Sequence, residues 1–203
     1  MMQFHFAPQV CALIVVDVQV DFCSPDGSTA KRGKPNTRMQ ALPDKINAFV
    51  KAIAGLGLTL VYAKSVISEE RLAPNVRFFN EMKGIKRPTQ EGSGGEEFYR
   101  LEIPADAIIV RKETSDPFTF TNLKHILEER QISTVLICGV RTEICVDATA
   151  RKAFSEGYNV IVISDLVATR DSNLEDERYA LRFIDAYVGF VMDSAQAKRV
   201  LQT

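Results

Sequence analysis

Short, continuous runs of aliphatic residues constrain the fold of this chain more than any other feature of its sequence. The three clearest runs cover residues 13–16, 135–138 and 160–163. Strands that are buried on both faces have this pattern, and such strands are typical of parallel sheets. Weaker runs at 58–63 and 107–110 and a short one at 188–192 bring the expected number of strands to six.

Amphipathic segments lie between these runs and predict helices. One helix is expected to begin at Pro43 and Asp44 and to end at the glycines at 55 and 57. The other helices are expected to follow Asn122, to run from about Glu143 to Ser155, to follow Asn173, and to begin at Asp193 or Ser194. Alternating strands and helices indicate an α/β protein with a parallel sheet.

Two segments do not fit this alternation. Residues 18–39, with two prolines and two glycines, are expected to be a loop. Residues 65–105 contain three prolines and four glycines, and a segment of that length is usually functional or carries short helices of its own. We expect it to roof a site within a single domain that spans residues 1–203.

Charge and targeting signals exclude several classes of partner. The chain has 25 Lys and Arg against 26 Asp and Glu, so its overall charge does not favour nucleic acid or an anionic membrane. The N-terminus has no basic region before its apolar run, and that run ends at Asp17, so no signal peptide or spanning helix is expected. These features predict a cytoplasmic protein.

The numbers and positions of the cysteines and histidines limit the kinds of site that the chain can form. The four cysteines, at 11, 23, 138 and 145, form no C-x-x-C pair and are expected to be free thiols in a reducing compartment. Because the only histidines are His5 and His125, a histidine-rich metal site is excluded, and we predict no metal.

Several common motifs fail on spacing. In the segment from Gly27 to Lys34 five residues rather than four separate the glycines, and Pro35 stands where a P-loop has a hydroxyl. The glycines at 92, 94 and 95 form no dinucleotide-binding motif. No serine lies in a G-x-S-x-G turn, which argues against a serine hydrolase. We therefore expect no cofactor.

Three reactive side chains fall at the carboxyl ends of expected strands: Asp17, Lys112 and Cys145. Ligands of open parallel sheets bind at that edge, so the three side chains can meet there. A cysteine in the first turn of a helix is expected to be a thiolate, because oriented N–H groups and a nearby ammonium favour the anion. Asp17 could take the thiol proton and later activate water, while Lys112 holds the carboxylate.

The residues around these three positions resemble the isochorismatase-like cysteine hydrolases, whose amidase branch includes nicotinamidase, N-carbamoylsarcosine amidase, ureidoacrylate amidase and biuret hydrolase. The matching blocks are A-L-I-V-V-D-V-Q-V-D-F at 12–22, G-S-G-G-E-E-F at 92–98, I-V-R-K at 109–112, I-C-G-V-R-T-E-I-C-V-D-A-T-A at 137–150 and A-F-S-E-G-Y-N-V-I-V-I-S-D at 153–165. They cover most of the chain in the right order.

The resemblance implies a Rossmann-like α/β/α fold with strand order 3-2-1-4-5-6 and a triad of Asp17, Lys112 and Cys145. It also implies a cis peptide between Val140 and Arg141, with the Arg141 and Cys145 amides as the oxyanion hole. A small amide, ureido or carbamoyl compound would be hydrolysed through an acyl-enzyme. A homodimer or homotetramer is implied as well.

Departures from the family pattern narrow the range of substrates that we expect. No histidine follows the second expected strand, which disfavours a metal-dependent nicotinamidase, and Cys145 favours the amidase branch over true isochorismatases. Val20 replaces the usual asparagine, and Phe22 and Phe118 are the candidate pocket walls. Two alternatives stay open: a non-catalytic binding member of the fold, and an ether or lactone hydrolase of the isochorismatase type.

Overall fold

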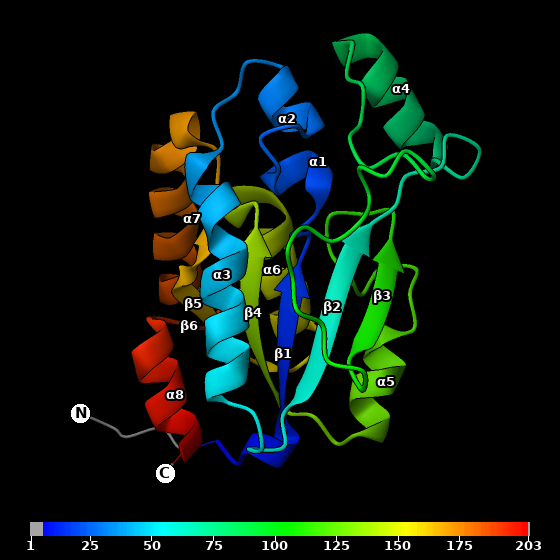
Figure 1. The fold of residues 1–203 in the computed structure, drawn as a ribbon. Helices are drawn as coiled ribbons and strands as arrows, with labels where there is room; N and C mark the ends of the chain where they lie inside the picture. The colour runs from blue at the N-terminus through cyan, green and yellow to red at the C-terminus, as the bar shows by residue number, and fades with distance from the viewer. Residues whose placement is uncertain (1–5, 203) are drawn as a thin grey trace.

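The six apolar runs form the strands of one all-parallel sheet in the computed structural model, which describes residues 6–202 (Figure 1). The strand order, β3-β2-β1-β4-β5-β6, confirms the prediction. The strands are β1 (Cys11–Val16), β2 (Thr59–Ser65), β3 (Ile108–Lys112), β4 (Thr134–Val140), β5 (Asn159–Ala168) and β6 (Phe190–Met192).

Helices cover both faces of the sheet, as predicted (Figure 1). The α-helices are α1 (Val20–Cys23), α2 (Ser28–Lys31), α3 (Thr37–Ala52), α4 (Pro74–Lys83), α5 (Leu123–Glu129), α6 (Asp147–Ser155), α7 (Leu174–Tyr187) and α8 (Ser194–Gln202). Short turns of other helix types occur at Pro8–Val10, Thr142–Val146 and Asp171–Asn173. Helices α3 and α8 pack on one face, and α5, α6 and α7 contribute to the core on the other.

The strand β1 shows why these runs are apolar at every position. Leu13 and Val15 point into the core beneath α3 and α8, whereas Ala12 and Ile14 point into the opposite core. Successive side chains of a strand alternate between faces, so a central strand covered on both sides needs apolar residues throughout. Every residue of β1 and β4 is buried.

The helix expected to begin at Pro43 begins two turns earlier, at Thr37, so that prediction was wrong. The carboxylate of Asp171 accepts hydrogen bonds from the backbone N–H groups of Thr37 (3.1 Å) and Arg38 (3.4 Å). A carboxylate at this place satisfies amide groups that otherwise lack partners in the first turn of a helix. The stabilising group comes from a distant part of the sequence, so no local signal marks it.

The two irregular segments contain more structure than loops alone. Residues 18–39, predicted to be a loop, contain α1, α2 and the first turn of α3. Residues 65–105 contain α4; an isolated bridge between Gln19 and Phe98 ties the segment to the end of β1, and a second one, between Ile67 and Gln90, joins two parts of the segment itself. Within residues 6–202 no helix is both long and apolar enough to cross a bilayer.

Candidate active site

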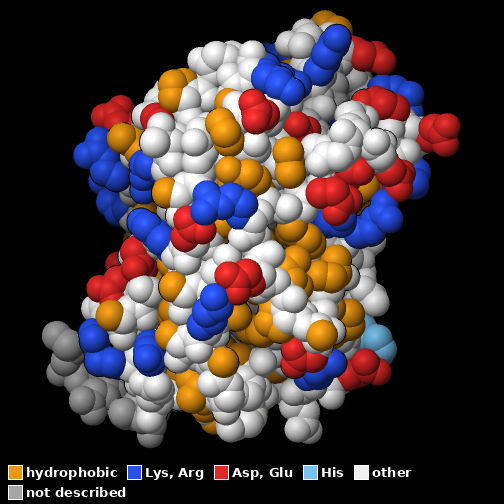
Figure 2. Space-filling model, viewed as in Figure 1, with side chains coloured by type: hydrophobic (Ala, Val, Ile, Leu, Met, Phe, Trp, Pro, Cys, Tyr) orange, Lys and Arg blue, Asp and Glu red, His pale blue; other side chains and the backbone are white. Residues whose placement is uncertain are grey.

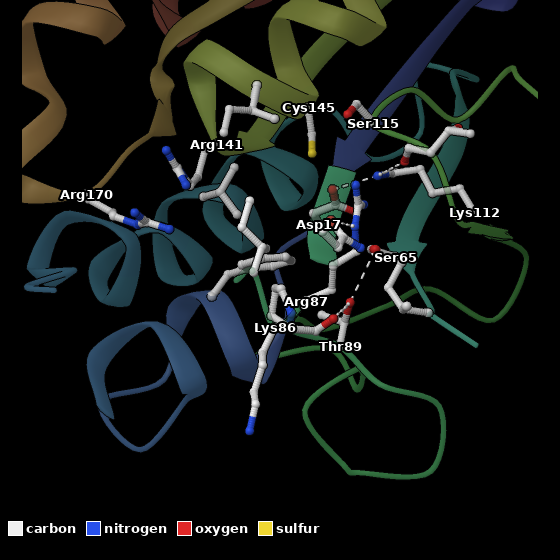
Figure 3. A pocket seen from close by; sticks show the side chains of 18 of the residues that line it. Asp17, Ser65, Lys86, Arg87, Thr89, Lys112, Ser115, Arg141, Cys145 and Arg170 are labelled. Atoms are coloured by element: carbon white, nitrogen blue, oxygen red, sulfur yellow. Dashed lines mark hydrogen bonds and ion pairs between the residues drawn. The ribbon is translucent and has the colours of Figure 1, made fainter. Parts of the chain in front are cut away.

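Asp17 and Lys112 form a buried ion pair at the carboxyl edge of the sheet (Figure 3). Asp17 directly follows β1, and Lys112 is the last residue of β3. The Lys112 Nζ donates to Asp17 Oδ2 at 2.7 Å and to the backbone carbonyl of Thr114 at 3.0 Å. Both charged side chains are only 1% exposed.

Lys112 must cross a strand to reach Asp17, because β2 lies between β1 and β3. Adjacent strands are about 4.8 Å apart, so the two backbones are separated by about 10 Å. The β2 residue in register with Lys112 is Ser65, and Asp17 is bound to β2 by a hydrogen bond from its N–H to the Ala63 carbonyl (2.9 Å). The small Ser65 side chain leaves room for the lysine chain to pass over the end of β2.

Cys145 comes to the same place from the turn between β4 and α6. A cis peptide joins Val140 to Arg141, as the resemblance implied, and residues 142–146 then form a π-helical turn ahead of α6. Cys145 and Asp17 line the same cavity and interact electrostatically. Asp17 Oδ1 is buried and accepts no hydrogen bond from residues 6–202, so it is the atom available to take a proton from the thiol.

The environment of Cys145 favours the thiol rather than the expected thiolate. Burial raises the pKa of Cys145 to about 12; the Asp17 carboxylate raises it too, while Lys112 and Arg141 act in the opposite direction. Desolvation of the sulfur thus opposes the thiolate that the helix terminus and the nearby positive charge were expected to favour.

Lys112 remains an ammonium in this site. Burial acts to lower the pKa of Lys112, but Asp17 foremost, with Cys145 and Asp116, acts to raise it, and the net shift is upward. The net effect therefore favours the ammonium form of Lys112 beside Asp17.

A cavity of about 250 Å³ opens in front of these groups, and the long segment 65–105 supplies part of its wall. Phe22 lines it, together with Ile67, Phe79 and Ile85. Phe118 does not, so its assignment as a pocket wall was wrong: its ring lies in the core against Tyr158, with centroids 5.9 Å apart. The backbone N–H of Phe118 donates to Asp116 (2.9 Å), in a turn that carries the ring into the core.

Sequence reasoning missed Gln19, although it lies inside the matching block at 12–22. Gln19 is fully buried; its Nε2 donates to the carbonyls of Ser65 (2.8 Å) and Glu96 (2.7 Å), and its Oε1 accepts the Ser65 N–H (2.9 Å). One side chain thus ties the end of β1 to the end of β2 and to the segment 92–98.

Asp21 has a similar supporting role. Its carboxylate accepts the backbone N–H groups of Ser28 (3.0 Å) and Thr89 (2.6 Å). A Cβ at Gly95 would come within 2.4 Å of that carboxylate, which explains a glycine there. The spacing V-D-V-Q-V-D-F contains the signal for both supporting residues, but the geometry is needed to interpret it.

Metal ligands do not gather in the part of the chain that the structure describes. Among residues 6–202 no group of three or more His, Cys, Asp and Glu side chains is arranged to hold an ion. His5 lies outside the described residues.

Comparisons with known proteins agree with this fold. The chain is 29% identical over 203 residues to a ureidoacrylate amidohydrolase of Klebsiella pneumoniae, covering 93% of this chain and 85% of that protein. A cysteine hydrolase from Pseudomonas syringae has a TM-score of 0.84 at 22% identity, covering 100% of this chain and 98% of that one.

A pyrazinamidase of Pyrococcus horikoshii, solved in complex with zinc, has a TM-score of 0.72 at 28% identity and covers 90% of this chain and 98% of its own. The family description for the isochorismatase domain matches residues 11–196, which is most of the chain. The chain therefore belongs to the isochorismatase family.

Proposed function

We propose that this protein is a cysteine hydrolase that cleaves a carbon–nitrogen bond, other than a peptide bond, in a small amide, ureido or carbamoyl compound. The observation that carries the proposal is that Cys145 lines the same cavity as the buried Asp17–Lys112 pair, in which Asp17 Oδ1 accepts no hydrogen bond from residues 6–202. The relatives named as a ureidoacrylate amidohydrolase and a pyrazinamidase support amide hydrolysis.

The first half of the reaction forms an acyl-enzyme. As Cys145 Sγ attacks the substrate carbonyl carbon, the thiol proton passes to Asp17 Oδ1, so sulfur becomes nucleophilic only when substrate is present. The carbonyl oxygen becomes an oxyanion, for which the backbone N–H groups of Arg141 and Cys145 are the proposed donors. Asp17 returns the proton to the departing nitrogen, the C–N bond breaks, and a thioester remains.

The second half hydrolyses the thioester. Asp17 takes a proton from water, the resulting hydroxide attacks the carbonyl carbon, and the thiolate leaves and regains the proton. Lys112 positions the carboxylate through the 2.7 Å contact and offsets negative charge on sulfur in both halves. A thiol with a pKa of about 12 needs such a base at the moment of attack.

Ammonia release from a panel of small amides and ureas tests the proposal. We expect Cys145→Ala to lower the rate at least about a thousandfold on any substrate that the wild type cleaves. Cys11→Ala makes the same substitution at a thiol in the core, distant from the cavity lining, and should retain activity. Full ammonia release by Cys145→Ala would refute the proposal.

The same panel separates the two alternatives. A non-catalytic binding protein would turn over none of the compounds, and an ether or lactone hydrolase would form product without releasing ammonia. Either result would replace the amidohydrolase assignment.

A further inference from the structure

Positive charge is concentrated in the cavity although the chain as a whole is almost neutral. Basic and acidic side chains are mixed over the face seen in Figure 2. By contrast, the cavity is lined by a single carboxylate, Asp17, and by the cations Arg32, Lys86, Arg87, Lys112, Arg141 and Arg170.

Two of these six cations are neutralised within the protein. Lys112 pairs with Asp17, and Arg141 pairs with Glu143, its Nε donating to Oε1 at 3.0 Å. The remaining four form no ion pair with a carboxylate of residues 6–202. Arg87 has a neutral partner, Asn80, at 3.4 Å. The cavity therefore keeps an excess of positive charge.

Arg170 is the least satisfied of the four. It follows β5, is half-buried, and its Nε is inaccessible to solvent yet has no hydrogen-bond partner among the described residues. Burial and the neighbouring Arg141 and Arg32 lower the pKa of Arg170, with Glu143 opposing them. In Figure 3, Arg170 and Arg141 lie across the cavity from Lys112.

The nearby carboxylates are held elsewhere. Asp171 accepts hydrogen bonds from the first turn of α3. Glu177 accepts from Arg38 (2.5 Å) and from Thr142 (2.7 Å). Glu143 acts on Arg170 electrostatically, but its Oε1 accepts from Arg141. No acidic side chain among residues 6–202 accepts a hydrogen bond from Arg170 Nε, and a buried donor of a charged group is costly to leave without a partner unless a ligand completes it.

Resting on the proposed function, we propose that the substrate carries a carboxylate, which Arg170 binds on the side of the cavity away from Lys112, with Arg32 and Arg87 adding positive charge. A guanidinium presents paired donors that match a carboxylate. Because the cavity of about 250 Å³ is smaller than typical drug-sized sites, it suits a compact acid that also contains the scissile amide or ureido group. Arg170 is thus a specificity-determining residue.

Modification of Cys145 by a matched pair of reagents tests this without a known substrate. One reagent is 2-carboxyethyl methanethiosulfonate and the other is propyl methanethiosulfonate, which carries a methyl in place of the carboxylate. Each transfers its thioalkyl group to sulfur and releases methanesulfinate. The other three thiols are fully buried, so the reaction reports Cys145. Both reagents need the thiolate, and the ratio of their rates cancels any change in its amount.

We expect the wild type to favour the carboxylate reagent and Arg170→Gln to lower the rate ratio by about tenfold or more, the loss typical of a charged hydrogen bond. Arg170→Lys should keep part of the preference. Arg178→Gln is the control, since it removes the same charge from an exposed position outside the cavity lining. An unchanged ratio in Arg170→Gln would overturn the proposal.

A second readout does not use Cys145. Succinate, but not succinamide, should raise the Tm of the wild type, and Arg170→Gln should abolish the shift. Equal shifts for both compounds, or a succinate shift that survives in Arg170→Gln, would count against carboxylate binding at this residue. If the protein released no ammonia from any compound but still bound succinate in preference to succinamide, the amidohydrolase assignment would be wrong and the carboxylate site would remain supported.

Discussion

Replacing Asp17 by asparagine should destabilise the protein because it leaves the buried charge of Lys112 without an ionic partner. The two side chains are 1% exposed and 2.7 Å apart, and without Asp17 the ammonium keeps only the Thr114 carbonyl at 3.0 Å. Removing one partner of a buried ion pair costs about 3–5 kcal/mol, since an uncompensated charge remains in the interior. We expect Asp17→Asn to lose about that much free energy of unfolding in urea at pH 7.

The double variant Asp17→Asn with Lys112→Met tests whether the loss of unfolding free energy comes from the unpaired charge of Lys112. Removing both charges should recover most of the loss, so the two single effects should not add. A loss below about 1 kcal/mol in Asp17→Asn, or a double variant as unstable as the sum of the singles, would refute the reasoning.

The pH dependence gives an independent check. In the wild type the pKa of Lys112 is raised, so the stability it contributes is complete below the ordinary lysine value of 10.5 and is lost as the pH rises above that value. Asp17→Asn removes the largest charge that opposes burial and leaves only Cys145 and Asp116, so we expect burial to lower the pKa of Lys112. The unfolded chain then binds more protons, so stability relative to the wild type should rise as pH increases toward 10.5.

Three further predictions concern the backbone, a helix terminus and the thiol. Gly139→Ala would place a Cβ 2.1 Å from the Val16 carbonyl oxygen at a φ of +116°, so we expect it to lose about 3 kcal/mol or more of unfolding free energy. The control, Gly33→Ala, adds a Cβ in open space and should lose about 1 kcal/mol. Equal urea midpoints for the two variants would contradict this prediction. Asp171→Ala should cost about 1 kcal/mol of unfolding free energy by removing the acceptor for the first turn of α3. Burial acts to raise the pKa of Asp171, but these hydrogen bonds lower it, and the net shift is downward. The stability that Asp171 contributes should therefore disappear as the pH falls below the ordinary value of 3.8. If Asp171→Ala unfolded in acid with the same curve as the wild type, the hydrogen bonds of Asp171 to α3 would not be stabilising. Alkylation of Cys145 by iodoacetamide should accelerate about tenfold per pH unit up to pH 11, because desolvation raises the thiol pKa to about 12; a plateau near pH 9 would contradict the raised pKa.

The fold was predictable because its signals are local and repeated. A strand such as β1, covered on both faces, must be apolar at every position, and this requirement appears directly in the sequence. Parallel strands need crossover segments, so the alternation of runs and helical patterns predicts the layers. The carboxyl ends of those strands then mark Asp17, Lys112 and the turn before Cys145 as neighbours.

Details that depend on distant contacts were not predictable in this way. The start of α3 is set by Asp171, which is 134 residues from Thr37 in the chain. Phe118 fits a pocket wall or a core equally well in sequence, and only its packing on Tyr158 decides between them.

The sequence by itself determined the sheet, its order through the family resemblance, and the residue types at its carboxyl edge, because periodicity and backbone preference act over a few neighbouring residues. Only the tertiary structure decided the state and surroundings of those residues. The Asp17–Lys112 pair joins positions 95 apart, desolvation raises the pKa of the nearby Cys145 thiol, and Arg170 Nε is left without a partner. Desolvation and charge depend on everything packed around a group, so they arise only when distant segments meet.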